Sequence, residues 1–303
     1  MWIIGNPHPH ALEGIDPERA GRDLLPRLEE SAEVVMARTT NWCIASWPTE
    51  GWARQVYPSL EPAEALERLS RELAHVSRLD EPDPAEAWRA RIAELKGAAN
   101  RIAERAFESL HFSGPGTDLS VGLFRSSVWR GGSLQRIDGL ESIVNIPTEE
   151  VFTTPDPARV EGVVRATKPL ELAGSLIEGI SVRFEGGRAV QIDADTNADV
   201  LRAVAAKDDG AARLGEVALV DGSGRIGALE TVFWNTLLDE NAASHIALGG
   251  SYDFVVEDEA ERALANQSQI HVDFMIGSPD VDVDGITSAG ENVPVLRGGA
   301  WQI

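Results

Sequence analysis

Polar and apolar residues alternate along residues 269–278, which read Gln-Ile-His-Val-Asp-Phe-Met-Ile-Gly-Ser. This alternation predicts a β-strand, in which residues two apart lie on the same face. His271 and Asp273 should therefore point to one side of a sheet, and Val272 and Phe274 to the other. An imidazole beside a carboxylate suits a divalent transition metal, although such a pair is more often solvated or internally hydrogen-bonded.

The first part of the chain has a mainly helical pattern. Proline follows an acidic residue at Pro17, Pro62 and Pro84, and this pairing is typical of the first turn of a helix. Apolar residues then recur at spacings of three and four, so three helices are predicted, and residues 60–112 are expected to be helical apart from one turn. Residues 1–5 and 41–47 are expected to form short strands.

Beyond residue 113 the pattern changes to short strands separated by turns. Strands are predicted over residues 119–123, 160–166, 176–184, 189–193 and 215–220, with a hairpin turn at 185–188. Residues 239–248 have a helix-like composition. We therefore predict an α+β fold. Residues 1–112 would form a partial N-terminal α/β domain with helices, and residues 113–303 a mixed, β-rich, metal-binding C-terminal domain.

Composition narrows the class of protein. The chain has 303 residues, of which 43% are hydrophobic and 25% charged, as in globular proteins. Its net charge of -22 argues against nucleic acid as a partner, and solubility is the ordinary reason for such acidity. Cys43 is the single cysteine, which excludes an intrachain disulfide and a thiolate metal site. Without a signal-peptide pattern or a long apolar run, we expect a soluble, cytoplasmic protein with no membrane partner.

Side chains that bind hard metal ions occur at four places in the C-terminal half. These are Glu149 with Glu150, then Glu216, then Glu240 with His245, and finally His271 with Asp273. Each place alone is better explained as a solvated or hydrogen-bonded group. Together, two histidines and several carboxylates without a thiol suit two divalent cations such as Zn²⁺, Co²⁺ or Mn²⁺. His8 and His10 are better explained as part of a rigid, proline-rich loop.

Four motifs follow one another in this half of the chain. They are Asn-Ile-Pro-Thr-Glu-Glu-Val-Phe-Thr-Thr-Pro at residues 145–155, Leu-Gly-Glu-Val-Ala-Leu-Val at 214–220, Asp-Glu-Asn-Ala-Ala-Ser-His-Ile-Ala-Leu-Gly at 239–249 and His-Val-Asp-Phe-Met-Ile-Gly-Ser at 271–278. Together they are highly specific, and they resemble the thermophilic aminopeptidase family, the M29 metallopeptidases. The resemblance implies a two-metal aminopeptidase that removes N-terminal residues from peptides by means of a metal-activated water.

The resemblance also implies roles for individual residues. The metal ligands carried over by motif are Glu150, Glu216, Glu240, His245, His271 and Asp273, with Glu216 bridging the two ions. Tyr252 matches an active-site tyrosine of the family and would donate a hydrogen bond to the oxyanion of the tetrahedral intermediate. Glu149 is a candidate proton acceptor because it adjoins a ligand, although neighbouring residues of a strand face opposite ways.

Family members are longer, so the resemblance implies that on the order of a hundred N-terminal residues are lacking, which would leave a smaller core. It also implies a homodimer whose active sites face an internal cavity. The leading hypothesis is an aminopeptidase with a broad preference for apolar N-terminal residues. One alternative is a truncated, non-catalytic homologue that folds, dimerises and binds metal without turnover. Another is a two-metal amidase that does not require a free α-amine.

Overall fold

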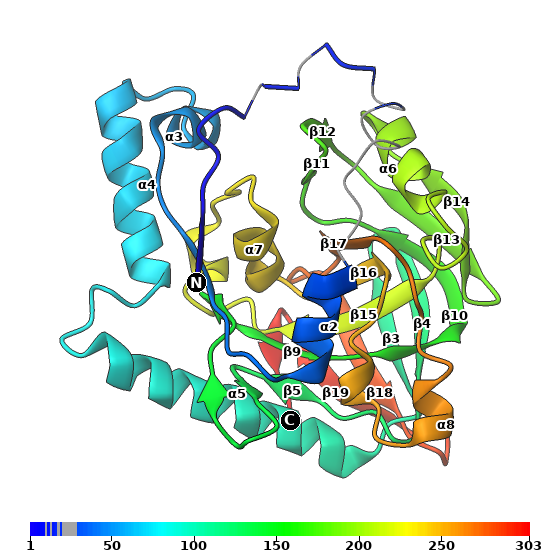
Figure 1. Cartoon of the computed structure of the whole chain (residues 1–303). Helices are drawn as coiled ribbons and strands as arrows, with labels where there is room; N and C mark the ends of the chain where they lie inside the picture. The colour runs from blue at the N-terminus through cyan, green and yellow to red at the C-terminus, as the bar shows by residue number, and fades with distance from the viewer. Residues whose placement is uncertain (10, 13, 17–18, 20–28) are drawn as a thin grey trace.

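The computed structural model describes residues 1–9, 11–12, 14–16, 19 and 29–303. Two antiparallel sheets form most of the second half of the chain (Figure 1). The larger sheet contains β3 (Ser109–Gly114), β4 (Thr117–Leu123), β10 (Pro155–Arg165), β13 (Ser181–Glu185), β14 (Arg188–Asp193), β18 (Asp282–Ile286), β19 (Asn292–Arg297) and β20 (Ala300–Trp301). Its strand order is β14–β13–β10–β4–β3–β18–β19–β20.

The smaller antiparallel sheet carries the predicted metal ligands. It contains β5 (Arg130–Gly131), β9 (Glu150–Thr153), β15 (Leu214–Val220), β16 (His245–Gly249) and β17 (His271–Met275), in the order β17–β16–β15–β9–β5. One face of this sheet packs against the larger sheet. Val217, Ile246 and Phe274 on that face share a hydrophobic core with Phe112 and Val160 of the larger sheet. The opposite face is therefore the one available for polar side chains.

A small parallel sheet contains strands from both sides of the predicted domain boundary at residue 112. It pairs β1 (Trp2–Ile4) with β2 (Ile44–Ser46), and β2 with β8 (Asn145–Ile146). Two further hairpins pair β6 (Leu134–Gln135) with β7 (Glu141–Ser142) and β11 (Leu170–Leu172) with β12 (Ser175–Ile177). Because β8 lies only a few residues before β9, the parallel sheet ends close to the first predicted ligand.

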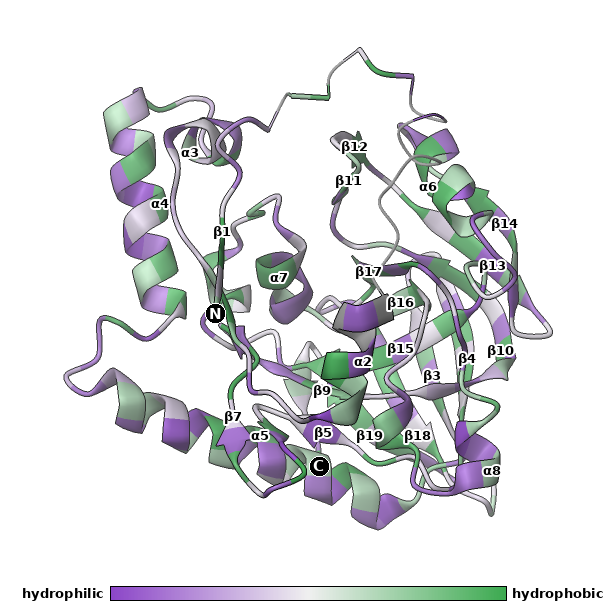
Figure 2. Ribbon diagram, in the orientation of Figure 1, coloured by the Kyte–Doolittle hydropathy of each residue, from purple (hydrophilic) through white to green (hydrophobic). Residues whose placement is uncertain are grey.

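The helices lie mainly around the sheets. They are α2 (Glu29–Ala37), α3 (Glu50–Val56), α4 (Pro62–Val76), α5 (Pro84–Arg105), α6 (Ala198–Ala205), α7 (Thr236–Asp239) and α8 (Glu259–Arg262), with 3-10 turns η1 (Gly227–Leu229), η2 (Glu240–Ala242) and η3 (Asp253–Val255). Helix α5 runs past β5, and α4 lies at the far side of the molecule from β13 and β14 (Figure 1). Hydrophilic and hydrophobic residues alternate along both helices (Figure 2). None of the helices in the described part of the chain has the length and apolar content needed to cross a membrane.

Several predicted elements are confirmed. Helices α4 and α5 begin at Pro62 and Pro84, and the Asp83 side chain accepts a hydrogen bond from the backbone N–H of Glu86 at 3.0 Å. Strand β17 and the hairpin between β13 and β14 are also present. The start of the helix predicted at Pro17 lies outside the described residues, and α2 covers its last part.

Other elements differ from the prediction. Residues 109–112 belong to β3 and not to a helix, so the proposed boundary at residue 112 falls inside a strand. The single strand predicted over residues 176–184 is two strands, β12 and β13. Helix α3 was not predicted at all, because its seven residues are too few to establish a helical period.

The prediction for residues 239–248 was wrong over most of its length. Only the beginning of this segment is helical, in α7 and η2, and β16 follows as the second strand of the five-stranded sheet. All five residues of β16 are buried. A strand buried on both faces has a continuous apolar sequence. Such a sequence shows neither the period of two of a strand nor the period of 3.6 of a helix, so periodicity cannot tell the two apart.

Candidate metal centre

The register of three strands gathers charged side chains on the outer face of the five-stranded sheet. Glu216 on β15 and Asp273 on β17 both pair with Ala247 of β16, which lies between them. His245 pairs with Ala218 in the same way. Paired residues of neighbouring strands share a face. The alanine methyl groups are small, so the longer charged side chains on either side can meet above them.

The charged side chains form two groups with a shared member. Nε2 of His245 lies 3.0 Å from Oε2 of Glu150 and 4.0 Å from Oε1 of Glu216. Nε2 of His271 lies 3.2 Å from Oε2 of Glu216 and 3.5 Å from Oδ1 of Asp273. In each group the three potential ligand atoms lie within 4.8 Å of one another, and Glu216 belongs to both groups. Glu216 is therefore the residue that could contribute a ligand atom to either group.

Backbone carbonyl groups orient both histidines. Nδ1 of His245 lies 3.2 Å from the carbonyl oxygen of Ala243, and Nδ1 of His271 lies 2.7 Å from that of Gly250. A neutral imidazole that donates from Nδ1 has a lone pair on Nε2. Both Nε2 atoms point into the carboxylate cluster, which is how a metal-binding histidine is usually held.

Gly249 allows the chain to curve around His271. Its φ angle is +107°, which favours glycine, and a Cβ atom there would lie 2.2 Å from the carbonyl oxygen of Ile270. The turn at Gly249 presents the next carbonyl group, that of Gly250, to the ring of His271. Gly249, the last residue of the third motif, and Gly250 after it thus help to orient a candidate ligand of the fourth motif.

Burial makes the excess negative charge of this cluster costly. Burial, opposed by a hydrogen bond with His271, raises the pKa of Glu216 to about 7, and burial with the nearby carboxylates raises the pKa of Glu240 well above its ordinary value. Burial alone would lower the pKa of His245, but the hydrogen bond and charge of Glu150 raise it to about 10. Burial would likewise raise the pKa of Asp273, but the charge of His271 holds it below its ordinary value.

The side chains fit divalent metal ions. Among the described residues, Oδ1 of Asp273 is buried and has no hydrogen-bond partner, since His271 lies at 3.5 Å. Carboxylate oxygens and imidazole nitrogens without sulfur are the ligands that Zn²⁺, Co²⁺ and Mn²⁺ share. A cation placed between them would complete the coordination of Asp273 and offset the negative charge.

The two other predicted cavity residues lie beside these groups. Glu240 is in η2, where it is buried and lines the same cavity, but it belongs to neither three-ligand group. The ring centroid of Tyr252 lies 5.2 Å from that of His271 and 5.7 Å from that of Phe152. The structure therefore brings seven of the eight predicted site residues to one place.

The cavity above the ligands has a volume of about 90 Å³. Besides the charged side chains, its lining includes the apolar residues Trp42, Leu134, Val144, Phe152 and Phe254. Three of these come from the segments around β2, β6 and β8. No local sequence pattern connects these segments with the candidate ligands, because their proximity depends on contacts between distant parts of the chain, such as the pairing of β2 with β8.

Glu149 is the exception. Its carboxylate is bound by two arginines: Oε1 lies 2.8 Å from Nη2 of Arg78, and Oε2 lies 2.6 Å from Nη2 of Arg91. Burial raises the pKa of Glu149, and the charges of Arg91 and Arg78 oppose that rise. The structure thus does not bring Glu149 to the cavity where a proton acceptor would act. Arg78 and Arg91 were not identified from the sequence, although Arg91 falls within the apolar stripe of α5, three residues after Trp88.

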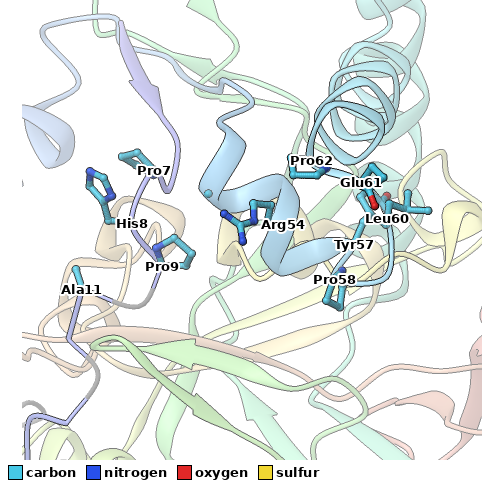
Figure 3. Close-up of a pocket in the computed structure, with 11 residues that line it drawn as sticks. Pro7, His8, Pro9, Ala11, Arg54, Tyr57, Pro58, Leu60, Glu61 and Pro62 are labelled. Carbon is cyan, nitrogen blue, oxygen red and sulfur yellow. The ribbon is translucent and has the colours of Figure 1, made fainter.

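His8, the other histidine considered above, lies elsewhere. It lines a separate cavity of about 770 Å³ together with Pro7, Pro9, Arg54 and Tyr57 (Figure 3). Neither three-ligand group found in the described part of the chain includes it. His10 lies outside the described residues. The exposed position of His8 agrees with the interpretation of residues 6–9 as a proline-rich loop.

Comparison with known proteins identifies the family. The family model described as thermophilic metalloprotease (M29) matches residues 1–301. Aminopeptidase T of Thermus aquaticus is 45% identical over 311 residues, which cover 100% of this chain and 76% of that protein. Aminopeptidase 2 of Geobacillus stearothermophilus is 37% identical over 308 residues, covering 98% of this chain and 75% of the relative.

A solved structure gives the same result. The structure of wild-type AmpT from Thermus thermophilus matches with a TM-score of 0.88 and 43% sequence identity, and the match covers 99% of this chain and 75% of that one. This similarity confirms the predicted α+β fold. The chain belongs to the M29 family of thermophilic metalloproteases.

Proposed function

We propose that this chain is a metallo-aminopeptidase that uses two divalent metal ions to hydrolyse N-terminal residues from peptides. The metallo-aminopeptidase activity is supported by the family and by relatives that are named aminopeptidases. The observation that carries the two-metal proposal is the membership of Glu216 in both groups of potential ligands. One ion would be held by Glu150, Glu216 and His245, and the other by Glu216, His271 and Asp273, with Glu240 beside them.

The residues of the cavity divide the remaining tasks. The bound ions would polarise the scissile carbonyl and acidify a water molecule. Tyr252, which lines the cavity, would donate a hydrogen bond from its hydroxyl group to the carbonyl oxygen as negative charge develops there. We do not assign the proton acceptor to Glu149, because its carboxylate is bound by Arg78 and Arg91.

The apolar lining supports a preference for apolar N-terminal residues. Trp42, Leu134, Val144 and Phe254 border the metal-binding side chains directly. An apolar side chain that enters this space leaves water and contributes favourable free energy, whereas a charged side chain would lose its hydration without a partner.

Three finer points belong to the same proposal, and the first comes from the family resemblance. The chain would form a homodimer, which light scattering coupled to size-exclusion chromatography tests by the mass of the particle. A cytoplasmic location stays a prediction from the sequence. The ions would be Zn²⁺, Co²⁺ or Mn²⁺, because the ligand set accepts all three.

The decisive experiment measures metal content and the hydrolysis of leucyl-p-nitroanilide on the same protein. We expect about two ions per chain, loss of activity with a chelator, and recovery with added Zn²⁺, Co²⁺ or Mn²⁺. Glu216→Gln should lower the activity at least ~10³-fold, because the several kcal/mol that the metals contribute would be lost. Glu171→Gln is the matched control, since Glu171 is a part-buried carboxylate of β11 outside the cluster.

The same experiment separates the alternatives. Two ions without turnover would favour a non-catalytic homologue, a possibility raised because the chain spans 76% of aminopeptidase T of Thermus aquaticus. Hydrolysis of N-acetyl-leucyl-p-nitroanilide at a similar rate would favour an amidase, because acetylation removes the free α-amine. A protein that binds no metal after reconstitution would refute the site.

A further inference from the structure

We propose that Glu149 is a positioning residue: clamped by Arg78 and Arg91, it fixes the two chain segments that present Glu150 and Glu240 to the metal ions. This inference rests on the proposed metal centre and adds to it the group that holds the ligands in place. It also links the helices α4 and α5 to the site.

The ion cluster around Glu149 is buried and specific. The side chain of Glu149 is 0% exposed, and those of Arg78 and Arg91 are 10% and 17% exposed. Each arginine binds a different oxygen of the carboxylate, at 2.8 and 2.6 Å. Arg78 donates a charge-assisted hydrogen bond, which is strong and directional, and Arg91 adds an ion pair at the other oxygen. The carboxylate therefore has little freedom to rotate, and the backbone of Glu149 is fixed with it.

A hydrogen bond passes this constraint to both ligand segments. The backbone N–H of Glu149 donates to Oδ1 of Asn241 at 2.6 Å, and Nδ2 of Asn241 donates to the carbonyl oxygen of Leu237 at 2.9 Å. Glu149 directly precedes Glu150, and Asn241 directly follows Glu240. The side chain of Asn241 thus connects the backbone next to Glu150 with the backbone next to Glu240, although these two residues are far apart in the sequence.

The arginines are themselves held by the helices. Arg78 follows α4 with a φ angle of +59°, and its guanidinium group lies 4.9 Å from the ring centroid of Trp88 on α5. The indole N–H of Trp88 donates to the carbonyl oxygen of Ser77 at 3.0 Å. Arg91 projects from α5 itself. The junction of α4 and α5 therefore acts as the fixed support to which Glu149 is attached.

The environment of Glu149 differs from that of a proton acceptor. A general base must be within hydrogen-bond reach of the proton that it removes. Both carboxylate oxygens of Glu149 are bound to guanidinium groups, and the residue does not line the cavity that contains the proposed ligands. Groups that orient metal ligands in this way typically affect metal affinity about 10–100-fold when they are mutated.

The test measures the affinity of metal-free protein for Zn²⁺ by competition with a chromogenic chelator. We expect Glu149→Gln to weaken binding about 10–100-fold, and a saturating concentration of Zn²⁺ to restore most of the leucyl-p-nitroanilide turnover. Glu94→Gln is the matched control, because the exposed carboxylate of Glu94 lies 2.9 Å from the same Arg91. Its affinity for Zn²⁺ should equal that of the wild-type protein.

Two further variants address the possibility that Glu149→Gln does not fold, which circular dichroism would detect. Arg91→Lys keeps the positive charge but cannot reproduce the fork of the guanidinium group. Asn241→Ala keeps the ion cluster and removes the hydrogen bond between the two ligand segments. Both variants should bind Zn²⁺ more weakly than the wild-type protein.

The possible results are distinct. If every folded variant among Glu149→Gln, Arg91→Lys and Asn241→Ala binds Zn²⁺ as tightly as the wild-type protein, the positioning role is refuted. If Glu149→Gln has unchanged affinity and its kcat at saturating Zn²⁺ falls about 10²–10⁴-fold, Glu149 is a proton acceptor and the inference is also refuted. If the wild-type protein itself binds no metal, the proposed function fails first.

Discussion

Two buried charge clusters lie on either side of one peptide bond. Glu149 faces Arg78 and Arg91, whereas Glu150 faces His245 and the carboxylates of the cavity. The first cluster has one carboxylate for two guanidinium groups. The second has four carboxylates for two imidazole rings, since Glu150 is joined there by Glu216, Glu240 and Asp273. Neighbouring residues that face opposite ways thus enter opposite electrostatic environments.

The two clusters differ in where their positive charge comes from, and this difference helps to recognise an ion-binding site among buried charges. Arginines supply the positive charge of the Glu149 cluster from within the chain, so the charge of that carboxylate is paired without an ion from outside. The cavity cluster has four carboxyl groups for two histidines, and burial together with the neighbouring carboxylates raises the pKa of Glu216 and of Glu240. Buried charges are stable only when they are paired or coordinate a metal. The second cluster is therefore the one in which a metal ion from outside would stabilise the ionised carboxylates.

The largest effect should appear in the stability of the metal-free protein, and it should have opposite signs in the two clusters. Glu149→Gln leaves the buried guanidinium group of Arg78 without its carboxylate and Arg91 with only the exposed Glu94, and we expect it to lower the free energy of unfolding by about 3–5 kcal/mol. Glu216→Gln relieves repulsion and should raise the free energy of unfolding, by roughly 1 kcal/mol or more. Urea denaturation in the presence of a chelator measures both.

Glu94→Gln again serves as the control, since an exposed ion pair contributes about 0–1 kcal/mol. A decrease in stability for both Glu149→Gln and Glu216→Gln would contradict the comparison, because the cavity cluster would then be complete without metal.

A smaller effect, on the rate of turnover, is expected at Tyr252, an uncharged residue beside the cavity cluster. Tyr252→Phe removes a hydroxyl group from the cavity but no charge, so it should lower kcat about 10²–10³-fold and leave the affinity for Zn²⁺ unchanged. Steady-state kinetics and chelator competition test the two parts separately. Tyr57→Phe is the matched control, because Tyr57 is the other tyrosine of the chain and is bonded to Glu72 far from the cavity. Equal kcat values for Tyr252→Phe and the wild-type protein would remove Tyr252 from the mechanism.

The smallest effect should concern substrate choice and involve neither cluster. Val144→Phe places a larger side chain in the apolar lining of the cavity. We expect kcat/KM for a leucyl substrate to fall about tenfold relative to that for an alanyl substrate, because pocket volume discriminates by 1–3 kcal/mol. Leu140→Phe, at an exposed position outside the cavity, should leave the ratio unchanged. An unchanged ratio for Val144→Phe would mean that the N-terminal side chain binds elsewhere.

Local patterns were sufficient to predict much of the fold. Proline after an acidic residue located the first turns of α4 and α5, and the alternation around His271 and Asp273 identified β17 and its two faces. Both signals depend only on residues that are close in sequence. The strand β16 was mistaken for a helix because its sequence, buried on both sides, has no polar face to define a period.

Parts of the candidate site could not be predicted from local sequence patterns. The motifs named the ligand segments, but their sequences contain nothing to indicate that Glu149 is bound by Arg78 and Arg91, or that Trp42 and Val144 reach the cavity. Both ion pairs of Glu149 join residues more than fifty positions apart, and they depend on how helices and sheets pack. An arginine within the apolar stripe of α5 was the one available signal, and it predicts burial without naming the partner.

The wall of the cavity has a consequence for the kind of cut that the protein can make. Trp42, Leu134 and Val144 border the candidate ligands and share a space of about 90 Å³ with Phe152 and Phe254. If the first residue of a peptide occupies this space, as proposed above, the apolar wall would limit how far the chain enters beyond the candidate ligands. Cleavage would then be confined to the peptide bond beside the free N-terminus.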